Sequence, residues 1–500
     1  MAGALQTVQC WHPHDFAFTS TTEYSNPFAV PFSGKLVGPN VERFEQLGFH
    51  VGNGTWVLRV SVPSTGTWCI TTCSEDPDLH GRHLCFHCVA NEDRACHGGI
   101  RVDPKHTHHF ICQDGTHPFL LGYECDWLWA LDLGSEWFPT GDAFLDKLSN
   151  FGFNHVVLNA YAHDTSWSPG NKKPHDLGPP PLFPWEGTNK KPDHSQFNLA
   201  FWRHYDYVIQ TLFEHSMFAH IMIKVYNKKV NWPEPGTPED DLYFKWLIAR
   251  YAAYPNVIWD FSKEAYNEES LDYKRSRFQL IRENDPYRRP ITSHDDNAYD
   301  DPSYQELVDF MSDQNHENWH AVAVRQRETH CWPVVNIEFG YEHGPQGIDD
   351  KTYKVVQSPE EVCHRAWEVT MAGAYPVYYY TYTAWDVLRT EDQPPGYTLM
   401  WNLKQFFEEI PFHLLEPSDA LVSEGHCLAH LGKTYVVYLR EAKPFEIDLS
   451  AVSNEAALRW YRPLQGDWIE ACPVQPGQAN LTPPKGSKGH PLACLIQAAG

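Results

Sequence analysis

The sequence predicts a mixed α/β fold, a (β/α)8 TIM barrel with an N-terminal β-sandwich and a small C-terminal antiparallel β-domain. Three observations carry this prediction. Turn-punctuated strand patterns fill residues 1–98, short apolar runs alternate with longer helical patterns over residues 99–412, and strand patterns return over residues 413–500. A chain of 500 residues is long enough for two or three domains.

The N-terminal part shows the alternation that is typical of half-buried strands. Apolar and other residues alternate over 56–62, a turn follows at Pro63-Ser-Thr-Gly66, and a strand pattern resumes over 67–72. Short strands separated by turns at close spacing are typical of an antiparallel sandwich. We expect no catalytic group from this part of the chain.

The central part contains eight short apolar runs, each a candidate strand of a parallel sheet. They span 119–123, 155–159, 219–225, 257–261, 290–294, 309–313, 334–337 and 375–380. Helical patterns lie between them, among others over 201–214 and 241–251. Eight strand–helix units over about 300 residues are the size of a (β/α)8 barrel. After residue 412, strand patterns at 430–439 and 457–462 predict the closing β-domain.

Composition and charge exclude several classes of function. Hydrophobic residues make up 42% of the chain and charged residues 21%, as in ordinary globular proteins. The net charge of −25 argues against a partner that is a nucleic acid or an anionic membrane. There is no apolar run long enough to span a bilayer. Because the N-terminus lacks a secretory pattern, a cytoplasmic location is expected, with secretion left open. The sequence also leaves open whether the protein forms a homo-oligomer.

Two glutamates stand where a barrel of this type places its active site, at the carboxyl ends of the strands. Glu264 follows the fourth predicted strand and Glu338 follows the seventh. Strands four and seven of eight face each other, so the carboxyl groups could lie about 5–5.5 Å apart, as a retaining glycosidase requires. Glu342 is the rival candidate for the nucleophile, and we rank it second because it lies beyond the strand end.

Aromatic and polar residues gather at the same predicted strand ends. Sugar rings stack on aromatic faces, and sugar hydroxyls need donors and acceptors. The side chains that we expect to contact substrate are Asp126, Trp127, Asn159, Tyr161, Lys263, His294, Gln314, His316, Tyr341 and Trp385. A metal-dependent hydrolase that uses His294, His316 and Asp126 is an alternative, but no HxH or HExxH spacing supports it. The prediction therefore includes no metal and no cofactor.

Six of the 13 cysteines lie between Cys69 and Cys112, interleaved with histidines such as His83 and His87. Thiolates and imidazoles are the usual ligands of zinc, so a metal site is one interpretation. The spacing does not form a paired CxxC frame. We favour reduced cysteines in the core.

Several motifs resemble known families. Residues 24–28, 48–54 and 55–59 resemble an N-terminal β-sandwich domain of the DUF5060 type. The barrel resembles the apiosidase-like, DUF4038 group of glycoside hydrolases, which is related to clan A. The stretches that carry this resemblance are 114–122, 249–259, 314–316, 333–338 with 340–342, and 380–386. The C-terminal domain resembles the β-domain that often follows such barrels.

The resemblance implies a retaining glycoside hydrolase with Glu264 as acid/base and Glu338 as nucleophile. It departs at one position, because clan A enzymes carry Asn directly before the acid/base, where this chain has Lys263. We expect an exo-acting enzyme for a plant or microbial oligosaccharide or glycoside. The rival function is a carbohydrate-binding protein that keeps the barrel without catalysis.

Overall fold

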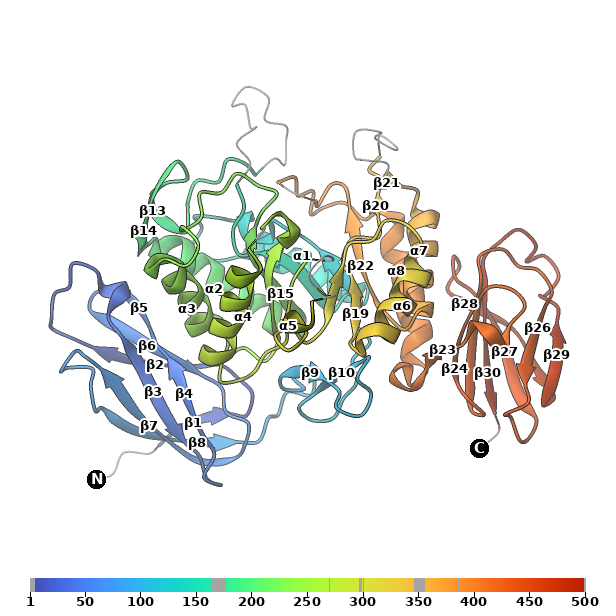
Figure 1. Ribbon diagram of the computed structural model, residues 1–500, viewed down its shortest axis with the longest axis horizontal. Helices are drawn as coiled ribbons and strands as arrows, with labels where there is room; N and C mark the ends of the chain where they lie inside the picture. Colours follow the sequence, from blue (N-terminus) through green and yellow to red (C-terminus); the bar gives the residue numbers. More distant parts are fainter. Residues whose placement is uncertain are drawn as a thin grey trace.

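The computed structural model describes residues 5–163, 177–268, 270–295, 299, 301–345, 356–384 and 386–498. Three parts follow one another along the long axis of the molecule in chain order (Figure 1). An all-β part lies at each end, and the mixed α/β part lies between them. Among the described residues, every helix is too short or too polar to cross a bilayer.

The N-terminal part consists of two sheets that share one core. The first has the order β1 (Gln6–Gln9), β8 (His83–Val89), β7 (Gly66–Ser74), β3 (Phe32–Val37), β4 (Arg43–Leu47). The second has the order β2 (His14–Thr19), β6 (Thr55–Val60), β5 (Phe49–Gly52). Alternate residues point inward because strand side chains have period two. Thus Trp56 and Leu58 of β6 bury against Trp68 and Ile70 of β7. β1 pairs with β8 in the parallel direction.

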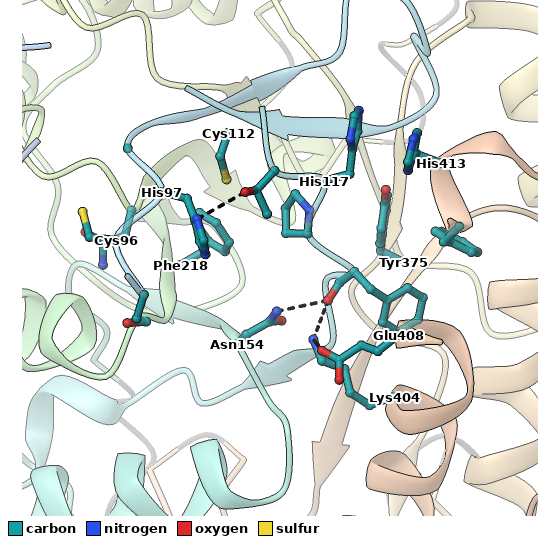
Figure 2. A pocket seen from close by; sticks show the side chains of 18 of the residues that line it. Cys96, His97, Cys112, His117, Asn154, Phe218, Tyr375, Lys404, Glu408 and His413 are labelled. Atoms are coloured by element: carbon teal, nitrogen blue, oxygen red, sulfur yellow. Dashed lines mark hydrogen bonds and ion pairs between the residues drawn. The ribbon is translucent and has the colours of Figure 1, made fainter. Parts of the chain in front are cut away.

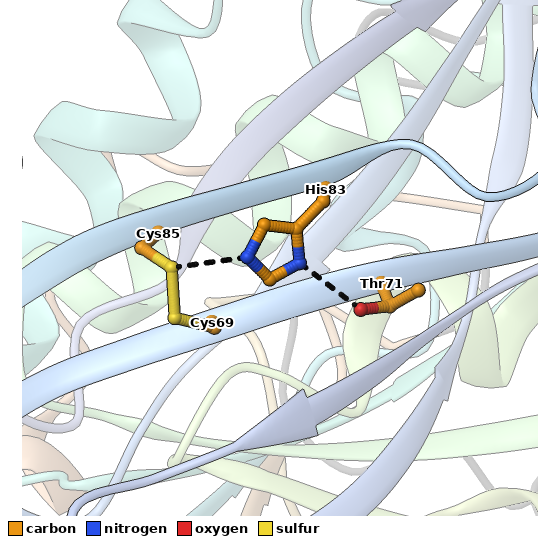
Figure 3. Close-up of a disulfide and its surroundings, with 4 residues drawn as sticks. All are labelled: Cys69, Thr71, His83 and Cys85. Atoms are coloured by element: carbon orange, nitrogen blue, oxygen red, sulfur yellow. Dashed lines mark hydrogen bonds between the residues drawn. A yellow bond between two sulfur atoms is a disulfide. The ribbon is translucent and has the colours of Figure 1, made fainter.

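Cysteines of this part form a disulfide, which corrects the expectation that they are reduced. Cys69 and Cys85 face each other in register on β7 and β8 and are bonded (Figure 3). His83 Nε2 lies 3.5 Å from the Cys85 sulfur. Because the bond uses both thiolates, this His–Cys group is not a metal site. Cys10 and Cys88 stay reduced and buried, with their sulfurs 3.2 Å apart.

The central part is built on a parallel sheet whose strand order follows the chain. The strands are β11 (Gly122–Glu124), β12 (His155–Asn159), β15 (Phe218–Val225), β16 (Val257–Lys263), β17 (Ile291–Thr292), β18 (Met311–Asp313), β19 (Val334–Asn336) and β22 (Tyr375–Tyr380). The last strand, β22, pairs in parallel with the first, β11. Between β17 and β18 the ladder is interrupted, and the Asp309 N–H donates to the Ile291 carbonyl at 2.8 Å. Each of the eight predicted strands overlaps an observed one, although the first lies at 122–124 instead of 119–123 and the fifth is reduced to 291–292.

Helices lie around the outside of this sheet (Figure 1). They are α1 (Pro139–Asn150), α2 (Leu199–Glu214), α3 (Pro238–Tyr251), α4 (Leu271–Asn284), α5 (Pro302–Gln305), α6 (Trp319–His330), α7 (Pro359–Met371) and α8 (Pro395–Glu408). Their starts follow local chemistry. In α3 the Thr237 hydroxyl accepts from the Asp240 N–H, Pro238 supplies a fixed φ, and acidic residues fill the first turn. Ser358 and Pro359 do the same for α7.

Smaller paired strands complete the central part. β9 (Ile100–Val102) and β10 (Phe110–Cys112) form a hairpin below the sheet, where His109 Nδ1 lies 2.9 Å from the Tyr375 hydroxyl at the start of β22 (Figure 1). β13 (Trp185–Thr188) pairs with β14 (Lys191–Phe197), and β20 (Tyr341–Glu342) pairs with β22 and with β21 (Val356–Gln357).

The C-terminal part packs against α6, α7 and α8 (Figure 1). One sheet has the order β23 (Glu416–Pro417), β24 (His426–His430), β25 (Thr434–Leu439), β30 (Leu492–Ala498), β27 (Ala456–Arg462), β28 (Asp467–Val474). β26 (Phe445–Leu449) pairs with β29 (Gly477–Leu481). Polar contacts cross to the helices: Arg327 to Glu416 at 2.7 Å, and His364 to the Tyr438 hydroxyl at 2.6 Å.

Candidate active site

Glu338 lies two residues beyond the end of β19, with its side chain almost fully buried at 4% exposure. Four neighbours contact its carboxylate. Gln314 donates to Oε2 at 2.9 Å, and the Tyr341 hydroxyl donates to Oε1. His316 Nε2 lies 3.5 Å from Oε1, and Lys263 Nζ lies 4.0 Å from Oε2. Donors and positive charge therefore surround this carboxylate on both oxygens.

These contacts decide the ionisation of Glu338. Burial raises the pKa of its carboxyl group, because a charge in a low-dielectric interior is poorly solvated. The contact with His316, the charges of Lys263 and His294 and the hydrogen bond from Tyr341 act in the opposite direction and outweigh burial. The result is a pKa of about 2. Glu338 is therefore a carboxylate at neutral pH.

Lys263 is the centre of a buried charge group that also contains carboxylates of β11 and of the loop after it. Its Nζ lies 2.5 Å from Glu124 Oε1 and 3.2 Å from Asp126 Oδ2, and the lysine is 2% exposed. The Tyr379 hydroxyl donates to Asp126 at 2.7 Å. With Glu338, three carboxylates share one ammonium group. Burial raises the pKa of Glu124 well above its usual range, since the Lys263 charge only partly offsets burial and two carboxylates lie close by.

Glu264 follows Lys263 directly and has a different environment. Its backbone is left-handed, with φ 50° and ψ 48°, a region that residues other than glycine rarely adopt. The side chain is partly exposed. Asn227 donates to Oε1 at 2.7 Å and Asn267 donates to Oε2 at 3.2 Å. Asn227 follows the end of β15, and the sequence analysis missed it, although a polar residue two positions after a strand was a usable signal.

Contacts between the strand ends link the surroundings of the two glutamates. Lys263, the neighbour of Glu264 in the chain, approaches Glu338 within 4.0 Å. Tyr266 donates to Gln314 Oε1 at 3.5 Å, and Gln314 in turn donates to Glu338. The carboxyl ends of β16, β18 and β19 therefore meet at one place, as the fold predicted.

Aromatic side chains pack along the neighbouring strand ends β11 and β12. Trp127 stacks on Trp129 with ring centroids 4.9 Å apart, and Trp129 contacts Tyr161 at 5.2 Å. Asn159 is 1% exposed, and neither polar atom of its side chain has a hydrogen-bond partner among the described residues. The same is true of the Tyr161 hydroxyl. Buried polar groups of this kind normally bind water or a ligand.

The histidines of this region do not form a metal-ligand group. His294 is fully buried at the end of its strand, and burial, helped by the charge of Lys263, lowers its pKa to about 4. In the described part of the chain, the groups with metal-ligand spacing are Cys69–His83–Cys85 and His320–Asp419–His426. His294, His316 and Asp126 do not form a third one. Trp385 lies outside the described residues.

Glu342, the rival nucleophile, lies on β20 and faces helix α8. The Tyr378 hydroxyl donates to its Oε2 at 2.7 Å. A Cβ atom at Gly396, in the first turn of α8, would clash with the same oxygen, so the carboxyl group packs directly against that helix. Burial raises its pKa to about 7, only partly offset by Tyr378. The two carboxyl groups therefore have different environments. Glu342 packs against α8, whereas Glu338 is surrounded by hydrogen-bond donors and the Lys263 charge.

Two cavities lined by described residues lie away from the carboxyl ends of the parallel strands. One of 530 Å³ lies at the amino ends of the strands and is lined by Phe119, Asn154, Phe218 and Tyr375 (Figure 2). Another of 880 Å³ lies between the N-terminal part and α3. Catalytic groups of such sheets lie at the carboxyl ends. Neither cavity is therefore the site of Glu264 and Glu338.

Family models match each of the three parts of the chain. The model of the "Apiosidase-like, catalytic domain" matches residues 104–411. A domain of unknown function, DUF5060, matches residues 7–75, and a "Putative collagen-binding domain of a collagenase" matches residues 417–495. No relative was found among curated proteins.

Solved structures share the fold. A "putative glycoside hydrolase" of Bacteroides vulgatus is 19% identical with a TM-score of 0.82, and the match covers 99% of this chain and 100% of that one. A family 5 glycoside hydrolase of the same organism is 19% identical with a TM-score of 0.60, covering 81% and 93%. The family model spans more than half of the chain, and the protein therefore belongs to the apiosidase-like family, with the fold of glycoside hydrolases.

Proposed function

We propose that the protein is a retaining glycoside hydrolase in which Glu338 is the nucleophile and Glu264 is the acid/base. The observation that carries this proposal is the contrast between the two carboxyl groups. Glu338 is buried and kept ionised by Gln314, Tyr341 and the Lys263 charge, whereas Glu264 is partly exposed between two asparagine amides. A nucleophile must be charged, and an acid/base must exchange protons with water.

The proposed reaction has two steps. In the first, a Glu338 oxygen attacks the anomeric carbon, and the bond to the leaving oxygen breaks as that oxygen takes the proton of Glu264. The sugar is then joined to Glu338 as an ester. In the second step, water gives a proton to Glu264 and attacks the anomeric carbon, which releases the sugar and restores both carboxyl groups.

The substrate that we propose is a plant or microbial oligosaccharide or glycoside, cleaved from one end. Asn159 and Tyr161 supply buried polar atoms for sugar hydroxyls, whereas Trp127 is 1% exposed and stacks on Trp129, so its contact with a sugar stays a prediction. We also propose that the parallel sheet is a closed (β/α)8 barrel and that the two N-terminal sheets form a sandwich.

Replacing Glu338 by Gln should abolish turnover with the fold intact, because Gln cannot attack the anomeric carbon. Replacing Glu264 by Ala should slow poor leaving groups most, and azide should restore turnover of activated substrates. The measurement is the hydrolysis rate over a panel of aryl glycosides, furanosides included. Far-UV circular dichroism checks folding.

Two matched control variants test whether the loss of activity is specific to the proposed catalytic glutamates. Glu342→Gln removes the rival carboxylate and should keep activity within a few-fold, since that side chain faces α8. Glu317→Gln removes an exposed carboxylate near His316 and should also leave activity unchanged. Activity of Glu338→Gln close to wild type would reject the nucleophile. If the wild type binds oligosaccharides but hydrolyses none of the panel, the non-catalytic binding function takes its place.

A further inference from the structure

Three potential metal ligands from the two sides of a domain junction meet beside α6, outside the site described above. His320 is the second residue of α6 in the central part. Asp419 and His426, the latter the first residue of β24, come from the C-terminal part. One ligand atom from each of the three lies within 4.8 Å of the other two. We propose that these residues bind a divalent transition-metal ion, with Zn²⁺ as the fitting species, and that the ion fastens the C-terminal part to α6.

The spacing of the ligand atoms matches a zinc site. His426 Nδ1 lies 3.0 Å from Asp419 Oδ2, and His320 Nδ1 lies 3.6 Å from the same oxygen. Zinc bonds of 2.0–2.1 Å in tetrahedral directions place neighbouring ligand atoms about 3.3 Å apart. The two observed distances lie on either side of that value.

A hydrogen bond explains only part of the arrangement. The contact between His426 and Asp419 has hydrogen-bond length, but 3.6 Å from His320 to Asp419 is too long for one. Yet His320 is only 8% exposed and directs Nδ1 toward the shared carboxylate. The imidazole rings of His320 and His426 stack with centroids 3.6 Å apart, an arrangement that two protonated rings would oppose by charge repulsion.

The carboxylate is also held in place from behind. Asp419 Oδ1 accepts the backbone N–H of Cys427 at 2.8 Å, which leaves Oδ2 directed at the two imidazoles. Such support of a ligand by a further hydrogen bond is common in metal sites. The ligand set spans the junction that Arg327 and Glu416 also bridge at 2.7 Å, so the ion would add a further link there. Both lone pairs can reach one ion only if the stacked rings, now inclined by 19°, tilt further apart.

The test is Zn²⁺ binding by the full chain after treatment with a chelator, measured by titration calorimetry at neutral pH. The wild type should bind one Zn²⁺ at this group and gain thermal stability. His426→Ala and Asp419→Asn should each weaken this binding at least about tenfold and lose the gain, because each removes one ligand. Asp419→Asn keeps an acceptor for the Cys427 N–H, so its fold should persist.

His430→Ala is the matched control, since it removes an imidazole from the other end of the same strand β24. The His430→Ala variant should bind Zn²⁺ with the same affinity as the wild type. Absorption of bound Co²⁺ should show tetrahedral coordination in the wild type and the control only. The proposal is overturned if the wild type binds no Zn²⁺, or if His426→Ala and Asp419→Asn bind it as well as His430→Ala. Metal-free melting temperatures of all variants separate loss of ligand from loss of fold.

Discussion

At the scale of single residues, the position before Glu264 defines this site. Where related glycosidases carry asparagine, Lys263 is buried between Glu124 and Asp126 and lies 4.0 Å from Glu338. Its ammonium group is therefore occupied by carboxylates of its own chain. The expected role of Lys263 in substrate contact remains a prediction, but its charge already acts on the ionisation of Glu338.

Tyr341→Phe should move the acid limb of the kcat/KM profile to higher pH. The Tyr341 hydroxyl donates to Glu338 and helps to hold its pKa at about 2, below the usual 4.5. Without that donor the pKa rises, and a smaller fraction of Glu338 is ionised as the pH falls. The measurement is the pH profile on an activated aryl glycoside.

Tyr380→Phe is the control for this shift, because its hydroxyl donates to Asp392 at 2.8 Å instead. Its acid limb should match that of the wild type. An unchanged limb in Tyr341→Phe would show that this hydroxyl does not control the nucleophile.

At the scale of elements, the disulfide between β7 and β8 joins neighbouring strands in register. The half-cystines are 16 residues apart, and closing a loop of that length in the unfolded chain corresponds to about 3 kcal/mol.

Cys69→Ser combined with Cys85→Ser should lower the free energy of unfolding of the N-terminal part by about 3 kcal/mol. Denaturant unfolding with and without a reductant measures this difference. Reductant should shift the wild type and leave the double variant unaffected. Cys73→Ser, which removes an exposed free thiol, should unfold like the wild type. Equal stability of oxidised and reduced wild type would contradict the prediction.

At the scale of the whole molecule, Arg59 connects the N-terminal sheets to the helices of the central part. Its guanidinium pairs with Asp15 at 2.8 Å and with Asp206 of α2 at 3.3 Å. It also donates to the Arg250 carbonyl in α3 at 3.0 Å. The Arg59 side chain is 8% exposed, whereas Asp15 is 45% exposed and Asp206 is 21% exposed, so only the arginine end of this contact is desolvated.

Arg59→Met should lower the free energy of unfolding of the N-terminal part by about 1–3 kcal/mol, because it leaves the buried Arg250 carbonyl without its donor, whereas Asp15 is partly solvated. We expect the N-terminal part to melt separately, which differential scanning calorimetry would record as an additional transition at lower temperature. Arg43→Ala, on the exposed side of β4, should keep the wild-type profile. A single unshifted transition in Arg59→Met would show that this contact does not couple the two parts.

Most of the strand positions and both candidate glutamates can be predicted from local patterns in the sequence. Apolar runs are local signals, and β12 and β22 have the predicted bounds. Likewise Glu264 and Glu338 could be found because each lies just beyond the end of such a run. Contacts between side chains of distant segments cannot be predicted from such local signals, because they depend on how the strands are brought together.

Contacts between distant segments became known only from the three-dimensional fold. It placed Asn227 against Glu264, gathered Glu124 and Asp126 around Lys263, and bonded Cys69 to Cys85. It also turned Glu342 toward α8 although only four positions separate it from Glu338. Periodicity reports whether a residue is buried, whereas hydrogen bonds and ionisation depend on distances of a few ångströms between residues far apart in the chain.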